Sequence, residues 1–129
     1  MKKVLIMMVI LVSMNSYGGE CPIAFGNDDY MDKVLTAIES KKSCTEENEI
    51  TEACAMGSSM DVQFVNSALK QCTKRVNRSA TVKKAVYDAS NLCTKKYARS
   101  SGTLAMSARA FCQLEVTMLY DNLLAPPEL

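Results

Sequence analysis

The sequence predicts a small all-α domain, a disulfide-stapled helical bundle of four to five helices. Apolar residues recur every three or four positions along most of the chain, as they do on one face of a helix. No segment alternates apolar and polar residues in the way that a half-buried strand does. Six cysteines in a chain of 129 residues are typical of a small exported domain that is held together by disulfides.

The first 18 residues have the plan of a secretory signal peptide. Two lysines precede an apolar run from Val4 to Val12, and small and polar residues follow it. The run is too short to cross a bilayer, so we expect no membrane span. The alternative, a first core helix, would show polar positions at helical spacing. We therefore expect residues 1–18 to be removed and residues 19–129 to form a single domain in a secreted or periplasmic protein.

All the cysteines lie after the expected cleavage point, so we expect three disulfides. They are Cys21, Cys44, Cys54, Cys72, Cys93 and Cys112. The alternative is a zinc site, but the sequence has no CxxC pair and no histidine. We expect neither a metal nor a cofactor.

The lack of histidine also removes the usual general base of serine and cysteine nucleophiles. Paired carboxylates, as in glycosidases, remain available in two acidic clusters. These are Asp28, Asp29 and Asp32, and Glu46, Glu47, Glu49 and Glu52. Acids near the start of a helix usually complement the helix dipole in solvent. We therefore expect a protein that is not an enzyme, with a hydrolase as a weaker alternative.

Spacing and capping signals predict five helices. The first covers about residues 28–42. Ser43 and Glu46 form a capping-box pattern that opens a short second helix. The third is expected at about residues 59–76, and the fourth begins after Ser79.

The fifth helix begins near Thr103 and ends before the two prolines of APPEL. Its apolar residues are expected to pack in the core: Leu104, Ala108, Phe111, Cys112, Val116, Leu119 and Leu123. Methionines are expected to fill gaps in the same core: Met31, Met60, Met106 and Met118.

The last two cysteines flank a short loop between the fourth and fifth helices. Two antiparallel helices joined by such a loop bring Cys93 and Cys112 within bridging reach, so we predict this disulfide. The loop would then be rigid at its base and exposed at its tip, as a binding loop requires. A plain turn, in which Gly and Ser serve only backbone geometry, remains the alternative.

Cysteines, polar residues and small residues match a known pattern between residues 44 and 124. The matching positions are Cys44, Cys54, Asp61, Asn66, Cys93, Gly102, Thr103, Cys112, Thr117 and Leu124. With this pattern the chain resembles the LprI-like lysozyme-inhibitor family of small exported helical domains. It departs from the family in AVYDASNLC, where a Trp and an Arg-Asp pair are usual, and at Tyr120, where the family has Arg.

The resemblance implies a non-enzymatic binding protein that blocks lysozyme and needs no cofactor. If the matched cysteines pair as Cys44–Cys54 and Cys93–Cys112, then Cys21 and Cys72 are left for each other. This pairing of Cys21 with Cys72 is a hypothesis by elimination among the connectivities that six cysteines allow.

Charge is distributed unevenly along the chain. Residues 19–61 hold ten acids against three lysines, a net charge of −7, while residues 62–129 hold ten bases against four acids, a net charge of +6. An acidic half can steer the encounter with a basic lysozyme, while a cationic loop enters its carboxylate-lined cleft. The alternatives are two solvated faces or self-association through the oppositely charged halves.

The specific hypothesis is that a four-residue loop tip occupies the lysozyme cleft. The tip consists of Arg99, Ser100, Ser101 and Gly102, with Arg99 facing the catalytic carboxylates.

The alternative function is that of a cell-envelope structural or interaction protein that binds anionic polymer or lipid. Its binding surface would be a basic helical stripe of Lys70, Lys74, Arg75, Arg78, Lys83 and Lys84. A nucleic acid is not an expected partner for an exported protein.

Overall fold

A computed structural model describes residues 19–77 and 79–124, and this part of the chain forms five helices without any strand. The helices are α1 (Tyr30–Glu39), α2 (Cys44–Ala53), α3 (Ser59–Val76), α4 (Ala80–Lys96) and α5 (Thr103–Leu124). The predicted all-α class is confirmed. The proposed signal peptide, Arg78 and the APPEL end lie outside the described residues.

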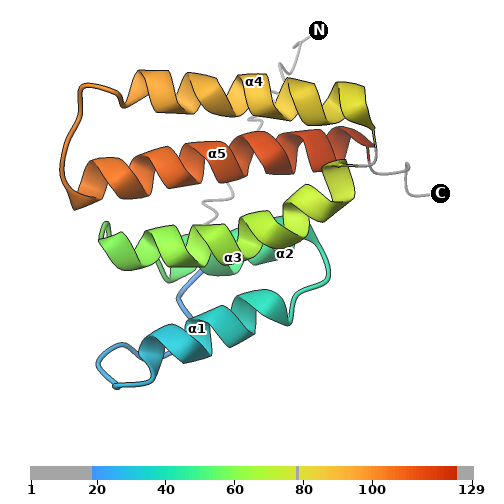
Figure 1. The fold of residues 1–129 in the computed structure, drawn as a ribbon. Helices are drawn as coiled ribbons and strands as arrows, with labels where there is room; N and C mark the ends of the chain where they lie inside the picture. The colour runs from blue at the N-terminus through green and yellow to red at the C-terminus, as the bar shows by residue number, and fades with distance from the viewer. Residues whose placement is uncertain (1–18, 78, 125–129) are drawn as a thin grey trace, which may run out of the picture.

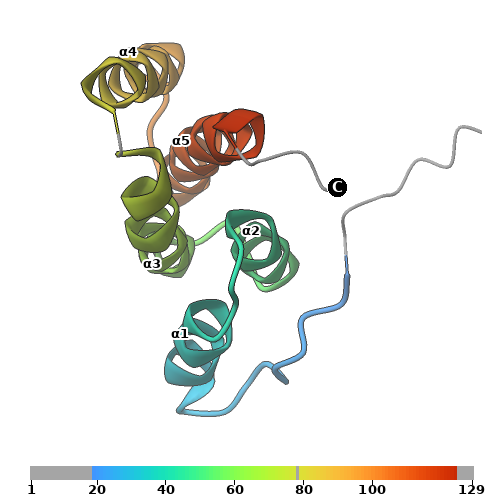
Figure 2. The same ribbon diagram turned by 90° about the vertical axis from the view of Figure 1, so that its right-hand side faces the viewer.

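The long helix α5 joins the two halves of the bundle. It packs against α3 on one side and α4 on the other, and it also touches α2 (Figure 1). The two short helices α1 and α2 pack against each other and against α3 (Figure 2). The stack therefore runs from α4 at one side through α5 and α3 to α1 at the other.

The core is centred on α3, whose buried side chains recur at helical spacing. Phe64, Val65, Ala68, Cys72 and Val76 are all fully buried. They meet Val34 and Ile38 from α1 and Leu114 from α5, which are also fully buried. Burial of each large apolar side chain contributes about 1.5–3 kcal/mol relative to exposure.

The start of α2 and the bounds of α3 agree with those predicted from the sequence. Ser43 and Glu46 form the predicted capping box, in which Ser43 Oγ accepts from the backbone N–H of Glu46 and Glu46 accepts from that of Ser43. The third helix has the predicted bounds. In contrast, α1 is shorter than the predicted 28–42, because the chain must turn into the extended backbone of Ser43 before α2.

Several residues of α5 that we expected in the core are exposed instead. A single stripe of α5 is buried, at Ser107, Ala110, Leu114 and Thr117. The correction concerns Leu104, Leu119 and Leu123, which are exposed, and Met106, which does not fill a core gap. Leu119 and Leu123 lie off the buried stripe, while Leu104 and Met106 lie in the first turn, at the end of the bundle.

Two of the three expected disulfides are corrected by the structure. The pairs are Cys21–Cys54, Cys44–Cys72 and Cys93–Cys112, with Cα atoms 4.8, 5.1 and 5.7 Å apart. The predicted Cys93–Cys112 bridge is present, but Cys44–Cys54 and Cys21–Cys72 are wrong. Cys44 begins α2 and Cys54 caps its other end. At about 1.5 Å of rise per residue their Cα atoms lie roughly 15 Å apart, well beyond the reach of a disulfide.

The buried carboxylate of Asp61 joins the loop between α2 and α3 to α5. It accepts hydrogen bonds from the backbone N–H groups of Met56, Gly57 and Ser58 at 2.7–3.2 Å. It also accepts from Ser107 Oγ on α5 at 2.7 Å. Because Asp61 is fully buried, its carboxylate depends on these donors and not on water for hydrogen bonds.

We predict that Asp61→Ala lowers the free energy of unfolding by on the order of 3 kcal/mol, because it removes the acceptor of four hydrogen bonds, including the one from the buried Ser107 hydroxyl. Chemical denaturation of the oxidised protein measures this. Asp32→Ala is the control, since Asp32 is an exposed first-turn acid of α1. Equal stability of the Asp61 and Asp32 variants would contradict the structural role of Asp61.

Candidate functional site

The helices α4 and α5 form an antiparallel hairpin at one side of the bundle. Among the residues of α4, Cys93 alone is buried, so α4 adds little to the core. Its main packing partner is α5. The Cys93–Cys112 disulfide links the two helices near the loop that joins them. The hairpin is therefore an arm whose geometry depends on a covalent bridge more than on apolar burial.

The loop holds the four residues of the predicted tip. Arg99, Ser100, Ser101 and Gly102 are all exposed. The backbone N–H of Ser100 donates to Tyr97 O at 3.1 Å, which closes a turn after α4. Gly102 has φ +92°, a conformation that favours glycine, and it directly precedes α5. The structure thus places the predicted tip together at the end of the arm.

A small depression of about 50 Å³ lies beside the tip. Ser100, Ser101 and Gly102 line it together with Tyr97, Met106 and Arg109. It is too small for a drug-sized ligand, for which pockets of about 300–1,000 Å³ are usual. The surface is better suited to contact with another macromolecule than to enclosure of a small molecule.

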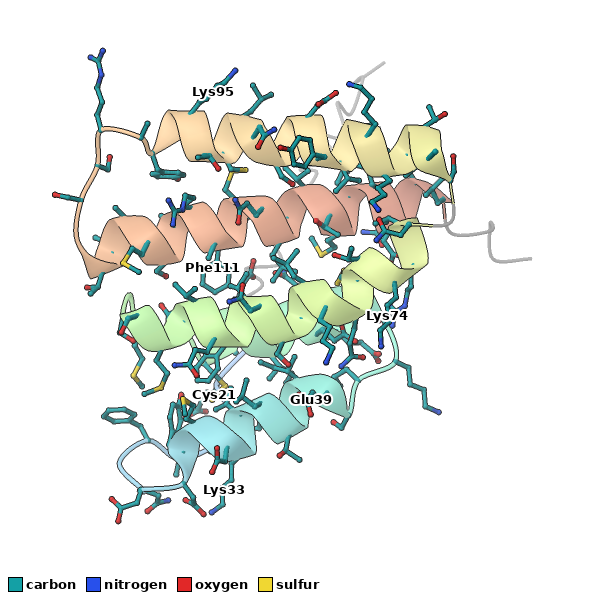
Figure 3. All side chains as sticks on the ribbon, viewed as in Figure 1. Cys21, Lys33, Glu39, Lys74, Lys95 and Phe111 are labelled. Carbon is teal, nitrogen blue, oxygen red and sulfur yellow. A yellow bond between two sulfur atoms is a disulfide. The ribbon has the colours of Figure 1, made fainter. Side chains whose placement is uncertain are left out.

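The arm is strongly cationic near its tip. Residues 89–114 contain no Asp or Glu, and their four basic side chains are Lys95, Lys96, Arg99 and Arg109. All four are exposed, and Lys95 projects from α4 on the side away from α5 (Figure 3). Lys96 Nζ lies 5.4 Å from the centroid of the Tyr97 ring. The sequence analysis omitted Lys95, Lys96 and Arg109, although the long acid-free stretch is visible in the sequence.

The basic stripe of the alternative function is less uniform than its sequence suggests. Lys70, Lys74 and Lys83 are exposed. Arg75 is instead paired with acidic side chains of α2 and α5. Lys84 donates to Asp88, and this hydrogen bond raises the pKa of Lys84. Two of the described stripe residues thus already have internal partners.

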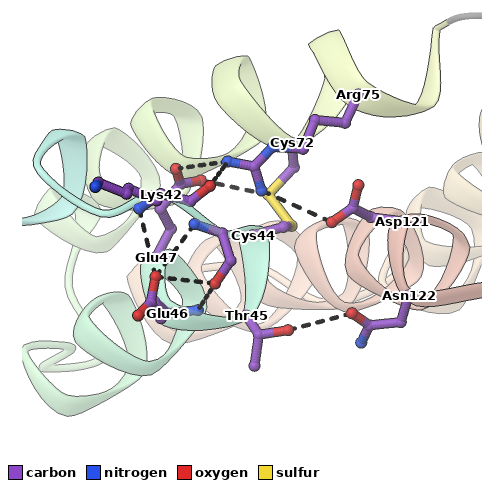
Figure 4. Close-up of polar contacts among 10 residues, drawn as sticks. Lys42, Cys44, Thr45, Glu46, Glu47, Cys72, Arg75, Asp121 and Asn122 are labelled. Carbon is purple, nitrogen blue, oxygen red and sulfur yellow. Dashed lines mark hydrogen bonds and ion pairs between the residues drawn. A yellow bond between two sulfur atoms is a disulfide. The ribbon is translucent and has the colours of Figure 1, made fainter. Parts of the chain in front are cut away.

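Arg75 belongs to a polar cluster beside the Cys44–Cys72 disulfide (Figure 4). Its guanidinium lies 3.7 Å from Glu47 Oε1 and 3.7 Å from Asp121 Oδ2, and it donates to the carbonyl of Lys42. Glu47 is fully buried, and its Oε1 has no hydrogen-bond partner. Cys72 Sγ lies 3.6 Å from the other carboxyl oxygen of Glu47.

This environment favours the neutral form of Glu47. Burial raises the pKa of its carboxyl to about 7, against the opposing effect of the Arg75 charge, and the negative charges of Asp121 and Glu46 add to the rise. A carboxyl with such a pKa can act as a general acid in an accessible cleft. Glu47 has no exposed surface for a substrate, so we assign it to the scaffold.

Within residues 19–77 and 79–124, no group of three or more Cys, Asp or Glu side chains is arranged to hold a metal ion. None of the helices in these ranges combines the length and apolarity needed to cross a membrane. Three disulfides fit an oxidising compartment outside the cytosol. Comparisons with family models, curated proteins and solved structures gave no match to this chain.

We predict that protonation of Glu47 makes stability depend on pH. The folded-state pKa of Glu47 is about 7 and the ordinary value is 4.5. The contribution of Glu47 to the free energy of unfolding is therefore fully present below pH 4.5, falls as the pH rises from there, and is lost above pH 7. The loss is on the order of 3 kcal/mol at about 1.4 kcal/mol per pH unit. Glu47→Gln should remove it. Unfolding of both proteins by urea, measured at several pH values, tests this.

The control for that comparison is Glu49→Gln, a change of an exposed carboxylate on the same helix. The Glu49→Gln variant should show the same dependence of stability on pH as the wild type. If the difference in stability between the wild type and Glu47→Gln were constant with pH, Glu47 would titrate equally in the folded and unfolded chains, and the assignment would be wrong.

Proposed function

We propose that the protein is an exported, non-enzymatic binding protein that inhibits a lysozyme through the loop between α4 and α5. The observation that carries this proposal is the braced, cationic tip of the arm. Arg99 stands on the loop between α4 and α5, within a stretch, residues 89–114, that contains no Asp or Glu. The Cys93–Cys112 disulfide holds together the two helices that carry this loop. Lysozymes cleave sugar chains with two carboxyl groups in a cleft, which is a suitable partner for such a tip.

The chemistry of the tip supports an inhibitory contact. An arginine guanidinium can donate two parallel hydrogen bonds to one carboxylate, and in a cleft it would do so away from competing water. Ser100 and Ser101 add hydroxyl groups, and Gly102 lets the backbone approach closely. The acidic helices α1 and α2 lie on the side of α5 and α3 away from α4, so they can attract a basic enzyme without entering the cleft (Figure 1).

The choice of lysozyme as partner comes from the resemblance to LprI-like lysozyme inhibitors, whose matched residues Cys93, Gly102 and Cys112 frame the same loop. The expected absence of catalysis remains part of the proposal.

Arg99→Glu should raise the inhibition constant against a susceptible lysozyme by about tenfold or more, because it places like charges in contact. Titration of enzyme activity with purified residues 19–129 measures this. Lys74→Glu is a matched control, since it makes the same change of charge on the exposed surface of α3. Circular dichroism should show the same helix content in both variants.

Two outcomes would count against the proposal. An unchanged inhibition constant for Arg99→Glu would exclude the loop tip. No inhibition of any lysozyme class by the oxidised wild type, with a reduced and alkylated sample beside it, would exclude the function itself.

A further inference from the structure

One end of the bundle exposes a row of large apolar side chains. Phe25 is 69% exposed, Met56 47%, Leu104 72% and Met106 42%. They come from the segment before α1, the loop between α2 and α3, and the first turn of α5. These segments meet at one end of the molecule because α1, α3 and α5 all start there, and α4 ends there (Figure 1).

Contacts link the three segments that carry these side chains. The rings of Phe25 and Tyr30 pack edge to face at 5.3 Å, and Tyr30 Oη donates to Cys54 O at 3.1 Å, two residues before Met56. A Cβ atom at Gly57 would lie 3.1 Å from Leu104 Cδ1. Met106 lines the depression beside the loop tip. We call this surface, from Phe25 to Met106, the end face.

The two edges of the end face carry opposite charges. At the α1 edge, residues 19–33 hold four acids, Glu20, Asp28, Asp29 and Asp32, against one base, Lys33, which pairs with Asp29 at 3.0 Å. At the arm edge, residues 89–114 hold the four bases named above and no acid. The three aspartates and all four bases are exposed. An apolar centre between a negative edge and a positive edge is complementary to a copy of itself turned by 180°.

We propose that the end face binds a second copy of this chain in a two-fold symmetric dimer. In this arrangement the arm edge of each copy lies against the α1 edge of the other, and the two apolar rows meet at the axis. Such an interface has the usual anatomy of an apolar centre with a polar rim. It is isologous, so it closes at two copies, unlike the head-to-tail association that separated charges alone would give.

The dimer does not depend on the proposed inhibition of lysozyme, and it is measured without any enzyme. It would cover the loop tip, so the same residues would serve one partner at a time. Because the end face is small and its edges are charged, we expect a weak interface that salt disrupts.

The experiment uses two double variants that each reverse two charges on one edge. Lys96→Glu with Arg99→Glu lowers the net charge of residues 89–114 from +4 to 0, and Asp28→Lys with Asp32→Lys raises that of residues 19–33 from −3 to +1. Sedimentation velocity is run on oxidised residues 19–129 at low salt, up to about 1 mM protein, where a weak interface is populated. The wild type should form dimers whose dissociation constant rises about tenfold or more in high salt. Each double variant alone should be monomeric.

The decisive measurement is an equimolar mixture of the two variants, which should restore a one-to-one dimer. At one rim the unchanged acidic edge of one variant faces the unchanged basic edge of the other, and at the second rim the reversed side chains of the two variants have opposite charges. The control is Lys70→Glu with Lys74→Glu, the same change of charge on α3, with Lys74 near the end of α3 opposite the end face (Figure 3). This control should still form dimers.

A monomeric wild type, dimers that survive the edge reversals, a mixture that stays monomeric, or a ladder of higher oligomers would each overturn the proposal. Inhibition of lysozyme can succeed or fail in any of these cases, so the two proposals are tested separately.

Discussion

The hydrogen bonds of Asp61 hold the loop between α2 and α3 against α5. The geometry of the end face depends on this connection. Three backbone N–H groups of the loop between α2 and α3 and the hydroxyl of Ser107 converge on one buried carboxylate. This sets the position of Met56 relative to the first turn of α5, and hence of the loop that leads into it. The arm edge, the apolar row and the depression beside the tip are thereby placed in one surface.

The residues that carry the family resemblance are mainly residues of this scaffold. Asp61 and Thr117 are buried, Gly102 adopts a positive φ, and the matched cysteines lie in disulfides. Arg99, which carries the proposed contact with lysozyme, is outside the matched set. These matched residues therefore serve to build the bundle, while a partner would contact exposed residues that the fold does not need.

Local signals in the sequence predicted where the helices lie, but they did not predict which cysteines pair or which polar side chains the packing of the helices buries. The capping box at Ser43 and the spacing of α3 are local properties, so they could be predicted. Helix geometry would also have excluded Cys44–Cys54 once both were placed at the ends of one helix. The burial of Glu47 and Asp61 could not be predicted in this way, because it depends on packing with α3 and α5. The apolar row was missed for the same reason, since its residues come from three separate segments.

Disulfides hold the segments that form both edges of the end face. The arm has one buried residue in α4 and is bridged by Cys93–Cys112, and the segment before α1 is tied to the end of α2 by Cys21–Cys54. A bridge restricts the unfolded chain and holds geometry without demanding particular neighbours on the surface. The charged and apolar side chains on these segments are thus free to serve recognition, because the fold does not need them. This explains how so small a bundle can present a surface that is acidic at one edge, apolar at its centre and basic at the other edge.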